Sequence, residues 1–367
     1  MATNKILIVG GARPNFMKIA PLIKQFEINN LNYKFIHTGQ HYDYNMSKIF
    51  FDNLKMPEPD IFLSVGSGSH AWQTAKIMIE FEKVIIKEKP SLVIVVGDVN
   101  STIACALVAK KLFIDVAHVE AGLRSFDMRM PEEINRILTD QISDLLFITE
   151  RSALENLKRE GIATNKIFHV GNVMIDNLIM NLDRAKNLDY NNKFNLKRGS
   201  YALVTVHRPS NVDSKGDLTY IVNILNYLQK KIKIIFPIHP RTRKNLTKYG
   251  LINKLNDANI NLIKPIGYLE FLSLMMNARL ILTDSGGIQE EATFLKIPTL
   301  TLRQNTERPI TVEKGTNLII DRDLEKLKIY LEKILANSYK KGLDIEKWDG
   351  KAAERIISIL KKHYNIK

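Results

Sequence analysis

Short apolar runs alternate with helical patterns along nearly the whole chain. The run LVIVV at 92–96 is typical, because it is too short for a buried helix and has no polar alternation. Such runs predict strands of parallel sheets that are covered by helices on both faces, and therefore an α/β fold. Strands are expected at 5–10, 34–38, 92–96, 116–119, 145–149, 166–170, 202–206, 233–237, 261–264, 280–283, 299–302 and 318–320. Helices are expected at 14–26, 42–54, 71–87, 101–112, 131–142, 152–160, from about 173, and at 216–230, 242–256, 269–277, 288–296, 324–336 and 351–363.

A polar segment at 189–200 separates two such series of similar length. A chain of 367 residues is long enough for a sizeable core in each. We therefore predict two doubly wound, Rossmann-like domains, 1–171 and 172–350. The last helix, within about 351–367, is expected to pack back on the first domain.

Composition narrows the classes of partner and cofactor. The net charge is +14, but no basic block is interleaved with aromatic residues, so an anionic small molecule is expected rather than nucleic acid. The single cysteine, Cys105, excludes an internal disulfide framework and a Cys-based zinc site. With no secretory signal and no bilayer-length apolar run, we expect a cytoplasmic protein that binds no membrane. The GGARPN segment lacks the nicotinamide fingerprint, and the histidines and carboxylates are not at metal-ligand spacing, so neither cofactor nor metal is expected.

One strand–turn–helix segment, 279–296, has the pattern of a phosphate-binding turn. Ser285, Gly286 and Gly287 follow a short apolar run, and a helical pattern resumes at Ile288. Glycines let the backbone approach an anion, and the first helical turn supplies free N–H groups. The alternative is an ordinary turn in which Ser285 caps the helix.

Further polar side chains follow other predicted strands, where ligands of open parallel sheets bind. Several are cationic, and so many anion binders suggest a diphosphate rather than one carboxylate. Since both domains contribute, we predict a single site in the cleft between them. The cationic residues are Arg13, Lys18, His207, Arg208 and Arg308.

Three carboxylates occur among these cations: Asp98, Glu120 and Glu132. Because carboxylates repel a phosphate, their presence suggests acid–base chemistry or contacts with sugar hydroxyls. Structural roles remain open for all three. Asp98 is placed to cap the next helix, Glu120 to pair with Arg124 or Arg136, and Glu132 to favour its helix N-terminus.

The motifs, in their order along 6–320, resemble those of the non-hydrolysing UDP-N-acetylglucosamine 2-epimerases. They include GGARPNFMKIAPL, HTGQHYDYNMS, VVGDVNST, HVEAGLRSFDMRMPEEINR, TVHRPSN, PIHPRT, LTDSGGIQEEA and LRQNTERP. The resemblance implies the two-domain GT-B architecture, with UDP on the C-terminal domain. It also implies that UDP-GlcNAc and UDP-ManNAc interconvert by elimination and re-addition of UDP through a 2-acetamidoglucal.

The family's functional positions carry over to residues of this chain. Arg136 matches a position important to the site, Phe271 the neighbour of uracil, Glu291 the ribose contact and Arg308 a nucleotide contact. The implied catalytic residues are Asp98, Glu120, Glu132 and His207. The implied substrate-binding residues are Arg13, Lys18, Arg136, Phe271, Ser285, Gly286, Gly287, Glu291 and Arg308.

The resemblance also implies a homodimer that supplies sugars for surface polysaccharide. Closure of the domains on UDP is a further hypothesis. Some members are activated by a second UDP-GlcNAc through a glutamine just after QH and a later arginine. Here Asp43 replaces that glutamine and the segment near Ser69 has no arginine, although Gln40 and His239 remain. We therefore predict weak or absent activation.

Other functions remain open at this stage. Relatives that epimerise UDP-2,3-diacetamido-glucuronate share HTGQH, RSFDMRMPEE and HPRT, whereas TERP favours UDP-GlcNAc. The hydrolysing 2-epimerases share the fold, but the GARPNFMK start favours the non-hydrolysing branch. A retaining glycosyltransferase would leave the carboxylates unexplained. A nucleotide-sugar-binding regulator without turnover is the non-enzymatic alternative.

Overall fold

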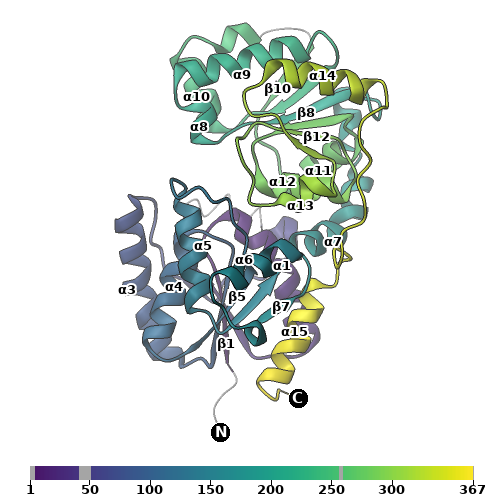
Figure 1. Ribbon diagram of the computed structural model, residues 1–367. Helices are drawn as coiled ribbons and strands as arrows, with labels where there is room; N and C mark the ends of the chain where they lie inside the picture. Colours follow the sequence, from purple (N-terminus) through teal and green to yellow (C-terminus); the bar gives the residue numbers. More distant parts are fainter. Residues whose placement is uncertain (1–4, 41–50, 256–258, 367) are drawn as a thin grey trace. The chain divides into compact units, whose positions relative to one another are not determined.

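The computed structural model describes residues 5–40, 51–255 and 259–366. The chain divides into two compact units, one of Met1–Met180 with Glu346–Lys367 and the other of Asn181–Ile345. The division falls inside helix α7 (Val173–Leu188), later than the predicted boundary at Gly171. Each unit is an α/β structure built on its own sheet (Figure 1).

The first unit contains a seven-stranded sheet in which every neighbouring pair is parallel. Its strands are β1 (Ile6–Gly10), β2 (Tyr33–His37), β3 (Ile61–Phe62), β4 (Leu92–Val96), β5 (Asp115–Ala121), β6 (Leu145–Ile148) and β7 (Ile167–His169). The order β3-β2-β1-β4-β5-β6-β7 begins with the six-strand order of the Rossmann fold.

Helices cover both faces of this sheet. On one face, Ile77 and Phe81 of α3 pack with β-strand residues such as Val93. On the other, Phe16 of α1 makes an edge-to-face contact with Phe35, and α15 packs against α1 (Figure 1). The helices are α1 (Arg13–Ile28), α3 (His70–Glu88), α4 (Asn100–Lys111), α5 (Pro131–Ile142), α6 (Arg151–Arg159), the 3-10 helix η1 (Thr164–Lys166), the first part of α7, and α15 (Ala352–His363).

The second unit repeats the same topology with six strands. They are β8 (Tyr201–Thr205), β9 (Lys233–Pro237), β10 (Ile260–Ile263), β11 (Leu280–Thr283), β12 (Thr299–Thr301) and β13 (Asn317–Ile319). The order is β10-β9-β8-β11-β12-β13, again parallel throughout. The expectation of doubly wound, Rossmann-like α/β units is confirmed.

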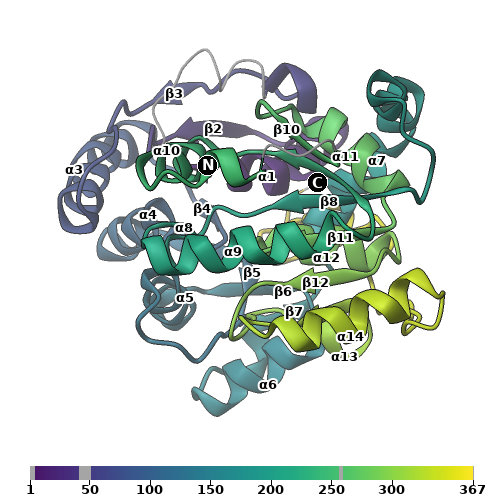
Figure 2. The ribbon, with the colours of Figure 1, turned by 90° about the horizontal axis from the view of Figure 1, so that it is seen from above.

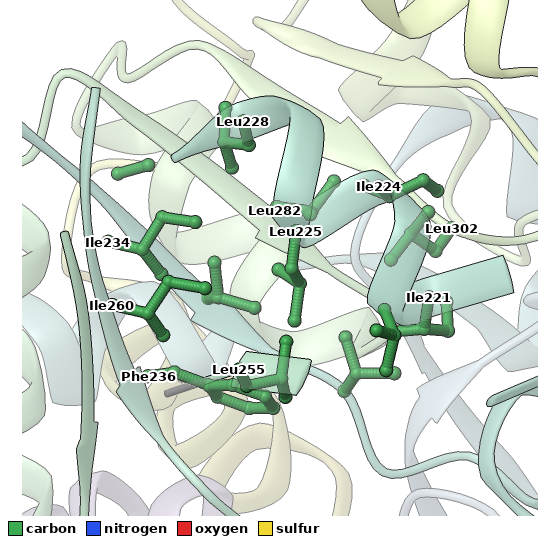
Figure 3. Packing of buried hydrophobic residues seen from close by; sticks show 14 of the residues in the cluster. Ile221, Ile224, Leu225, Leu228, Ile234, Phe236, Leu255, Ile260, Leu282 and Leu302 are labelled. Atoms are coloured by element: carbon green, nitrogen blue, oxygen red, sulfur yellow. The ribbon is translucent and has the colours of Figure 1, made fainter. Parts of the chain in front are cut away.

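Two apolar clusters enclose the second sheet. On one face, Leu225 packs with Ile234 and Leu282 (Figure 3). Leu203 and Ile281 belong to the cluster on the opposite face, as the two-residue period of a strand requires. Figures 1 and 2 show α9 and α14 on the first of these faces. The helices are η2 (Tyr190–Phe194), α8 (Pro209–Val212), α9 (Lys215–Leu228), α10 (Pro240–Lys248), η3 (Ile252–Leu255), α11 (Tyr268–Asn277), α12 (Gly286–Phe294), α13 (Pro309–Glu313) and α14 (Leu324–Leu335).

The shared strand order gives each sheet a switch point, between β1 and β4 in the first unit and between β8 and β11 in the second. At a switch point the helices that follow two neighbouring strands lie on opposite faces, which leaves a crevice at the carboxyl ends. No helix in the described part of the chain combines the length and apolarity that a bilayer crossing would need.

A few elements differ from expectation. The sequence pattern predicted neither β3 nor the short helices α8 and α13, since each is too short for a periodicity to be recognised. Helix α12 begins at Gly286 rather than Ile288. Residues 42–50 of the helix predicted at 42–54, among them Asp43, lie outside the described residues. The neighbouring His41 also lies outside them.

Candidate active site

Asp98 follows β4 at a tight turn of the first unit. Gly97 has φ of 69°, a conformation that favours glycine, and the next residue presents its carboxylate to Arg136 of α5. Helix α4 has Val99 at its N-cap position, so Asp98 does not cap this helix. The structure thus assigns Asp98 an ion pair with a buried guanidinium.

Arg136 is itself held by Glu133, a residue that sequence reasoning did not single out. Arg136 donates to Glu133 from Nε at 3.0 Å and from Nη2 at 2.5 Å. Glu133 also accepts the backbone N–H groups of Ser125 and Phe126. Burial would raise the pKa of Glu133, but these backbone donors and Arg136 outweigh it and lower the pKa. Of the two glutamates in PEE, Glu132 is exposed and Glu133 is the buried anchor.

Glu120 occupies an unusual backbone conformation near the end of β5. Its φ is 74°, and the pairing of β5 with β6 shifts register between Val119 and Ala121. A bulge of this kind re-aims a side chain, and a left-handed non-glycine residue costs about 1–3 kcal/mol. The buried carboxylate of Glu120 lies 2.6 Å from Nζ of Lys18. Arg124, an alternative partner suggested by the sequence, instead binds Asp140 and Glu160.

Asn15 fixes the turn between β1 and α1. Its side-chain oxygen accepts the N–H groups of Gly11 and Ala12, and its amide donates to the Val96 carbonyl at 3.0 Å. These bonds join the carboxyl ends of β1 and β4 at the switch point. Arg13 opens α1 and is half-buried at the same edge.

In the second unit, the buried carboxylate of Asp284 organises the end of β8. It accepts the N–H groups of His207 and Arg208 and the side-chain amide of Asn211. It also lies 3.2 Å from Nδ1 of His207, whose side chain remains 39% exposed. Burial would raise the pKa of Asp284, but these donors lower it. The His207 ring is 5.5 Å from that of His239, which sits at the N-cap position of α10.

The glycine turn after β11 leads directly into α12. Ser285 occupies the N-cap position, but its side chain makes no capping bond, so the alternative of a serine-capped turn does not hold. A methyl group on Gly286 would lie 2.6 Å from Nη1 of Arg308 and 2.7 Å from Glu307. The absence of a side chain at Gly286 therefore lets the Arg308 guanidinium approach the helix N-terminus, whose free N–H groups suit an anion.

Arg308 belongs to a buried network of charged side chains. It binds Glu290 at 2.9 Å and also Glu307, which accepts a 2.7 Å hydrogen bond from Arg303. Burial opposes ionisation of Glu307, but the neighbouring Arg308, Arg303 and Arg208 keep its pKa well below the ordinary value. With Arg208 3.9 Å from Glu307, three guanidinium groups surround the two glutamates, and Arg308 is held by both carboxylates beside the helix N-terminus.

Glu291 lies in the second turn of α12, because the helix begins at Gly286. Glu291 is fully enclosed and accepts a 2.8 Å hydrogen bond from Tyr268. Desolvation raises its pKa to about 8, against the lowering effect of Tyr268. Phe271, on the same helix as Tyr268, is half-buried against the apolar cluster that includes Leu274.

The residues at the strand ends of the first unit and those at the strand ends of the second unit suit different chemistry. The first unit presents carboxylates with fixed cationic partners, which suit proton transfer. The second presents a helix N-terminus, an arginine and a histidine, which suit a phosphate group. The structure gathers Arg13, Lys18, Asp98, Glu120 and Arg136 around the strand ends of the first unit, with Glu132 on α5. It gathers His207, Ser285, Gly286, Gly287 and Arg308 at those of the second, with Phe271 and Glu291 on α11 and α12.

Comparison with known proteins decides the family. The model of the family UDP-N-acetylglucosamine 2-epimerase matches residues 24–361. The chain belongs to the UDP-N-acetylglucosamine 2-epimerase family. This 2-epimerase family member is 51% identical to the UDP-N-acetylglucosamine 2-epimerase of Methanocaldococcus jannaschii, over 97% of this chain and 98% of that one.

Two further relatives of this family member bear on ligand and substrate. The crystal structure of the M. jannaschii enzyme in complex with UDP-GlcNAc and UDP superposes with a TM-score of 0.90 at 50% identity, covering 98% of this chain and 99% of that one. The UDP-2,3-diacetamido-2,3-dideoxy-D-glucuronate 2-epimerase of Pseudomonas aeruginosa is 46% identical, over 86% of this chain and 88% of its own.

Proposed function

We propose that this 2-epimerase family member interconverts UDP-GlcNAc and UDP-ManNAc without releasing free sugar. The observation that carries the proposal is the division of chemistry between the two strand-end sets. One set offers ion-paired carboxylates for proton transfer, and the other a helix N-terminus with Arg308 for a diphosphate. The M. jannaschii relative crystallised with UDP-GlcNAc and UDP supports the choice of ligand.

In this proposal the Asn181–Ile345 unit binds UDP. The first turn of α12 and Arg308 neutralise the diphosphate, His207 acts beside it, Glu291 contacts the ribose and Phe271 the uracil. The sugar is assigned to the carboxylates at the strand ends of the first unit. Arg13 and Lys18 would contact the substrate there.

The reaction requires a base and an acid near carbon 2 of the sugar. Carbon 2 is not adjacent to a carbonyl, so the bond to UDP breaks as the carbon 2 proton leaves, giving a 2-acetamidoglucal. UDP then returns to carbon 1 while a proton is delivered to the opposite face of carbon 2. Asp98, Glu120 and Glu132 are the proposed proton-transferring carboxylates, with the pair of Arg136 and Asp98 fixed before substrate arrives.

The second candidate substrate is UDP-2,3-diacetamido-glucuronate. It is supported by the P. aeruginosa relative at 46% identity. The UDP-N-acetylglucosamine 2-epimerase of M. jannaschii has the higher sequence identity, 51%, and this supports UDP-GlcNAc as the first candidate substrate. The same catalytic groups would serve either sugar, so the assay has to include both.

Incubation with UDP-GlcNAc in deuterated water, followed by proton NMR, tests the proposal. UDP-ManNAc with deuterium at carbon 2 and little free sugar is the expected product. Free ManNAc with an equal amount of UDP would place the chain in the hydrolysing branch. Turnover of the diacetamido-uronate alone would select the second substrate, and binding of UDP without turnover of either would indicate a regulator.

A cytoplasmic homodimer that supplies sugars for surface polysaccharide remains part of the proposal. The single, fully buried Cys105 is consistent with a reducing compartment. Sedimentation analysis of the full chain tests the dimer.

A further inference from the structure

A buried charged cluster lies behind the proposed catalytic carboxylates. His118 of β5 and Asp140 of α5 are fully buried, with His118 Nδ1 2.7 Å from Asp140 Oδ1. The other ring nitrogen, Nε2, lies 2.8 Å from the carbonyl oxygen of Gly97. Arg124 Nη2 lies 2.7 Å from Asp140 Oδ2 and 2.6 Å from Glu160.

The partners define where the protons are. A carbonyl oxygen only accepts, so Nε2 of His118 carries a hydrogen. Asp140 Oδ2 accepts from Arg124 and from the N–H of Gly122 at 3.0 Å, which favours an ionised carboxylate. Burial would raise the pKa of Asp140, but His118 and Arg124 outweigh it and lower the pKa. Both ring nitrogens of His118 thus have hydrogen-bonding partners, which fixes the orientation of the ring inside the cluster.

The hydrogen bonds of this cluster end on two turns. The Gly97 carbonyl immediately precedes Asp98, and the Gly97 N–H donates to Val119, the residue before Glu120. Gly122, held by Asp140, comes two residues after Glu120 and has φ of 77°. A methyl group on Gly122 would lie 2.7 Å from the Ala153 carbonyl, so this turn is closely packed as well as hydrogen-bonded.

We propose that Asp140 and His118 are positioning residues for the reaction, fixing the turns that carry Asp98 and Glu120. The inference rests on the proposed 2-epimerisation and extends it. His118 fixes the peptide between Gly97 and Asp98, while Asp140 fixes both His118 and the Gly122 amide. Neither side chain touches the sugar. Their effect is to hold two carboxylates, which come from different strands, in one geometry before substrate binds.

Two matched variants separate the two halves of this arrangement. The amide nitrogen of glutamine reaches the place of Nε2, and that of asparagine the place of Nδ1. His118→Gln therefore keeps a donor for the Gly97 carbonyl, whereas His118→Asn keeps only the contact with Asp140. Asp140→Asn keeps the volume of the side chain, but its amide NH2 group then faces one of the groups that donate to Asp140, which are His118, Arg124 and the Gly122 N–H.

Turnover should depend on the bond to Gly97. His118→Asn is expected to lower kcat by about 10²-fold, the cost of a small misplacement of a catalytic group. KM for the UDP-sugar and the Kd for UDP should change by less than about threefold, because ground-state binding is retained. His118→Gln should keep most of the activity, and Asp140→Asn should resemble His118→Asn.

Amide hydrogen exchange gives a readout that does not need turnover. His118→Asn should speed exchange at Gly97 while His118→Gln leaves it slow, and Asp140→Asn should speed exchange at Gly122, whose N–H Asp140 accepts. A wild-type protein without epimerase activity would contradict the proposed function, and the exchange result would still decide the positioning role. The inference would be overturned if His118→Asn and His118→Gln lost activity equally and both had a lowered melting temperature. It would also be overturned if His118→Asn were fully active, or if it turned over slowly while its turns exchanged as in wild type.

Discussion

Nζ of Lys18 lies 2.6 Å from Oε2 of Glu120, and both side chains are almost completely buried. Glu120 keeps this contact from a left-handed backbone conformation. Strained residues persist only where their surroundings hold them, and they concentrate at functional sites. The ammonium group therefore both compensates a buried charge and fixes the carboxylate.

Removal of Lys18 should destabilise the first unit strongly. Lys18→Met leaves Glu120 buried without this cation, which costs about 3–5 kcal/mol in comparable pairs. Urea unfolding at neutral pH measures the loss. The matched control is Lys5→Met, because its partner Glu88 keeps the 2.9 Å contact with Lys34. Similar losses in the two variants would contradict the role given to the Lys18 pair.

Asp98→Asn should abolish epimerisation and leave UDP binding largely intact. The amide still accepts a hydrogen bond from Arg136 but cannot take a proton, and UDP is assigned to the other unit. Deuterium incorporation at carbon 2 and calorimetric titration with UDP provide the two measurements. Asp144→Asn is the control, since Asp144 lies at the amino ends of the strands, away from Asp98 at their carboxyl ends, and pairs with Lys110. Joint loss of turnover and UDP binding in Asp98→Asn would indicate a structural role.

Glu291 should make the unliganded protein less stable as pH rises. Its pKa is about 8 in the folded state and 4.5 ordinarily, so between these values the folded state holds a proton that the unfolded state has lost. The contribution is fully present below pH 4.5 and is lost toward pH 8, by at most about 1.4 kcal/mol per pH unit. Glu291→Gln should flatten this dependence in urea unfolding at pH 5 to 8. The exposed Glu325→Gln should not, and parallel curves for wild type and Glu291→Gln would refute the assignment.

Gly286→Ala should weaken UDP binding. The new methyl group would displace Arg308 or Glu307, and overpacking of about 1–3 kcal/mol corresponds to roughly 5–150-fold in Kd. Gly216→Ala is the matched control. Gly216 lies in the first turn of α9, and a methyl group there would have Ser214 Oγ, 3.9 Å away, as its nearest neighbour, so alanine should add about 0.5–1 kcal/mol of stability. Unchanged Kd in Gly286→Ala would argue against a phosphate at this turn.

Added UDP-GlcNAc should not accelerate the reverse reaction. The expectation rests on the sequence alone, because Asp43 lies outside the described residues. Initial rates from UDP-ManNAc, measured with and without a small amount of UDP-GlcNAc, provide the test. A clear increase in rate would show that Gln40 and His239 are sufficient for activation without the missing glutamine and arginine.

Much of the fold followed from local pattern. Buried strands such as β4 and β11 were recognisable because parallel sheets require short continuous apolar runs. Asp98 and the Ser285 turn were identified for the same reason, since whatever follows such a strand lies at the ligand edge. The two-residue strand β3 and the five-residue helix α13 were missed because neither forms a pattern long enough to recognise.

The partners of the charged residues could not be predicted. Glu132 and Glu133 are equivalent in the PEE motif, and only packing shows that Glu133 is buried against Arg136. Arg124 was a plausible partner of Glu120, yet Asp140 and Glu160 bind it. Such choices depend on side chains brought together from distant parts of the chain.

By itself, the sequence determined the α/β class, the doubly wound sheets and the polar groups at the strand ends, because local periodicity and strand direction dictate them. Tertiary structure alone decided which carboxylates are ionised, such as Asp140, and which hold a proton near neutrality, such as Glu291. The reason is physical. Protonation depends on desolvation and on the distance to opposite charges, and both exist only once the chain has folded.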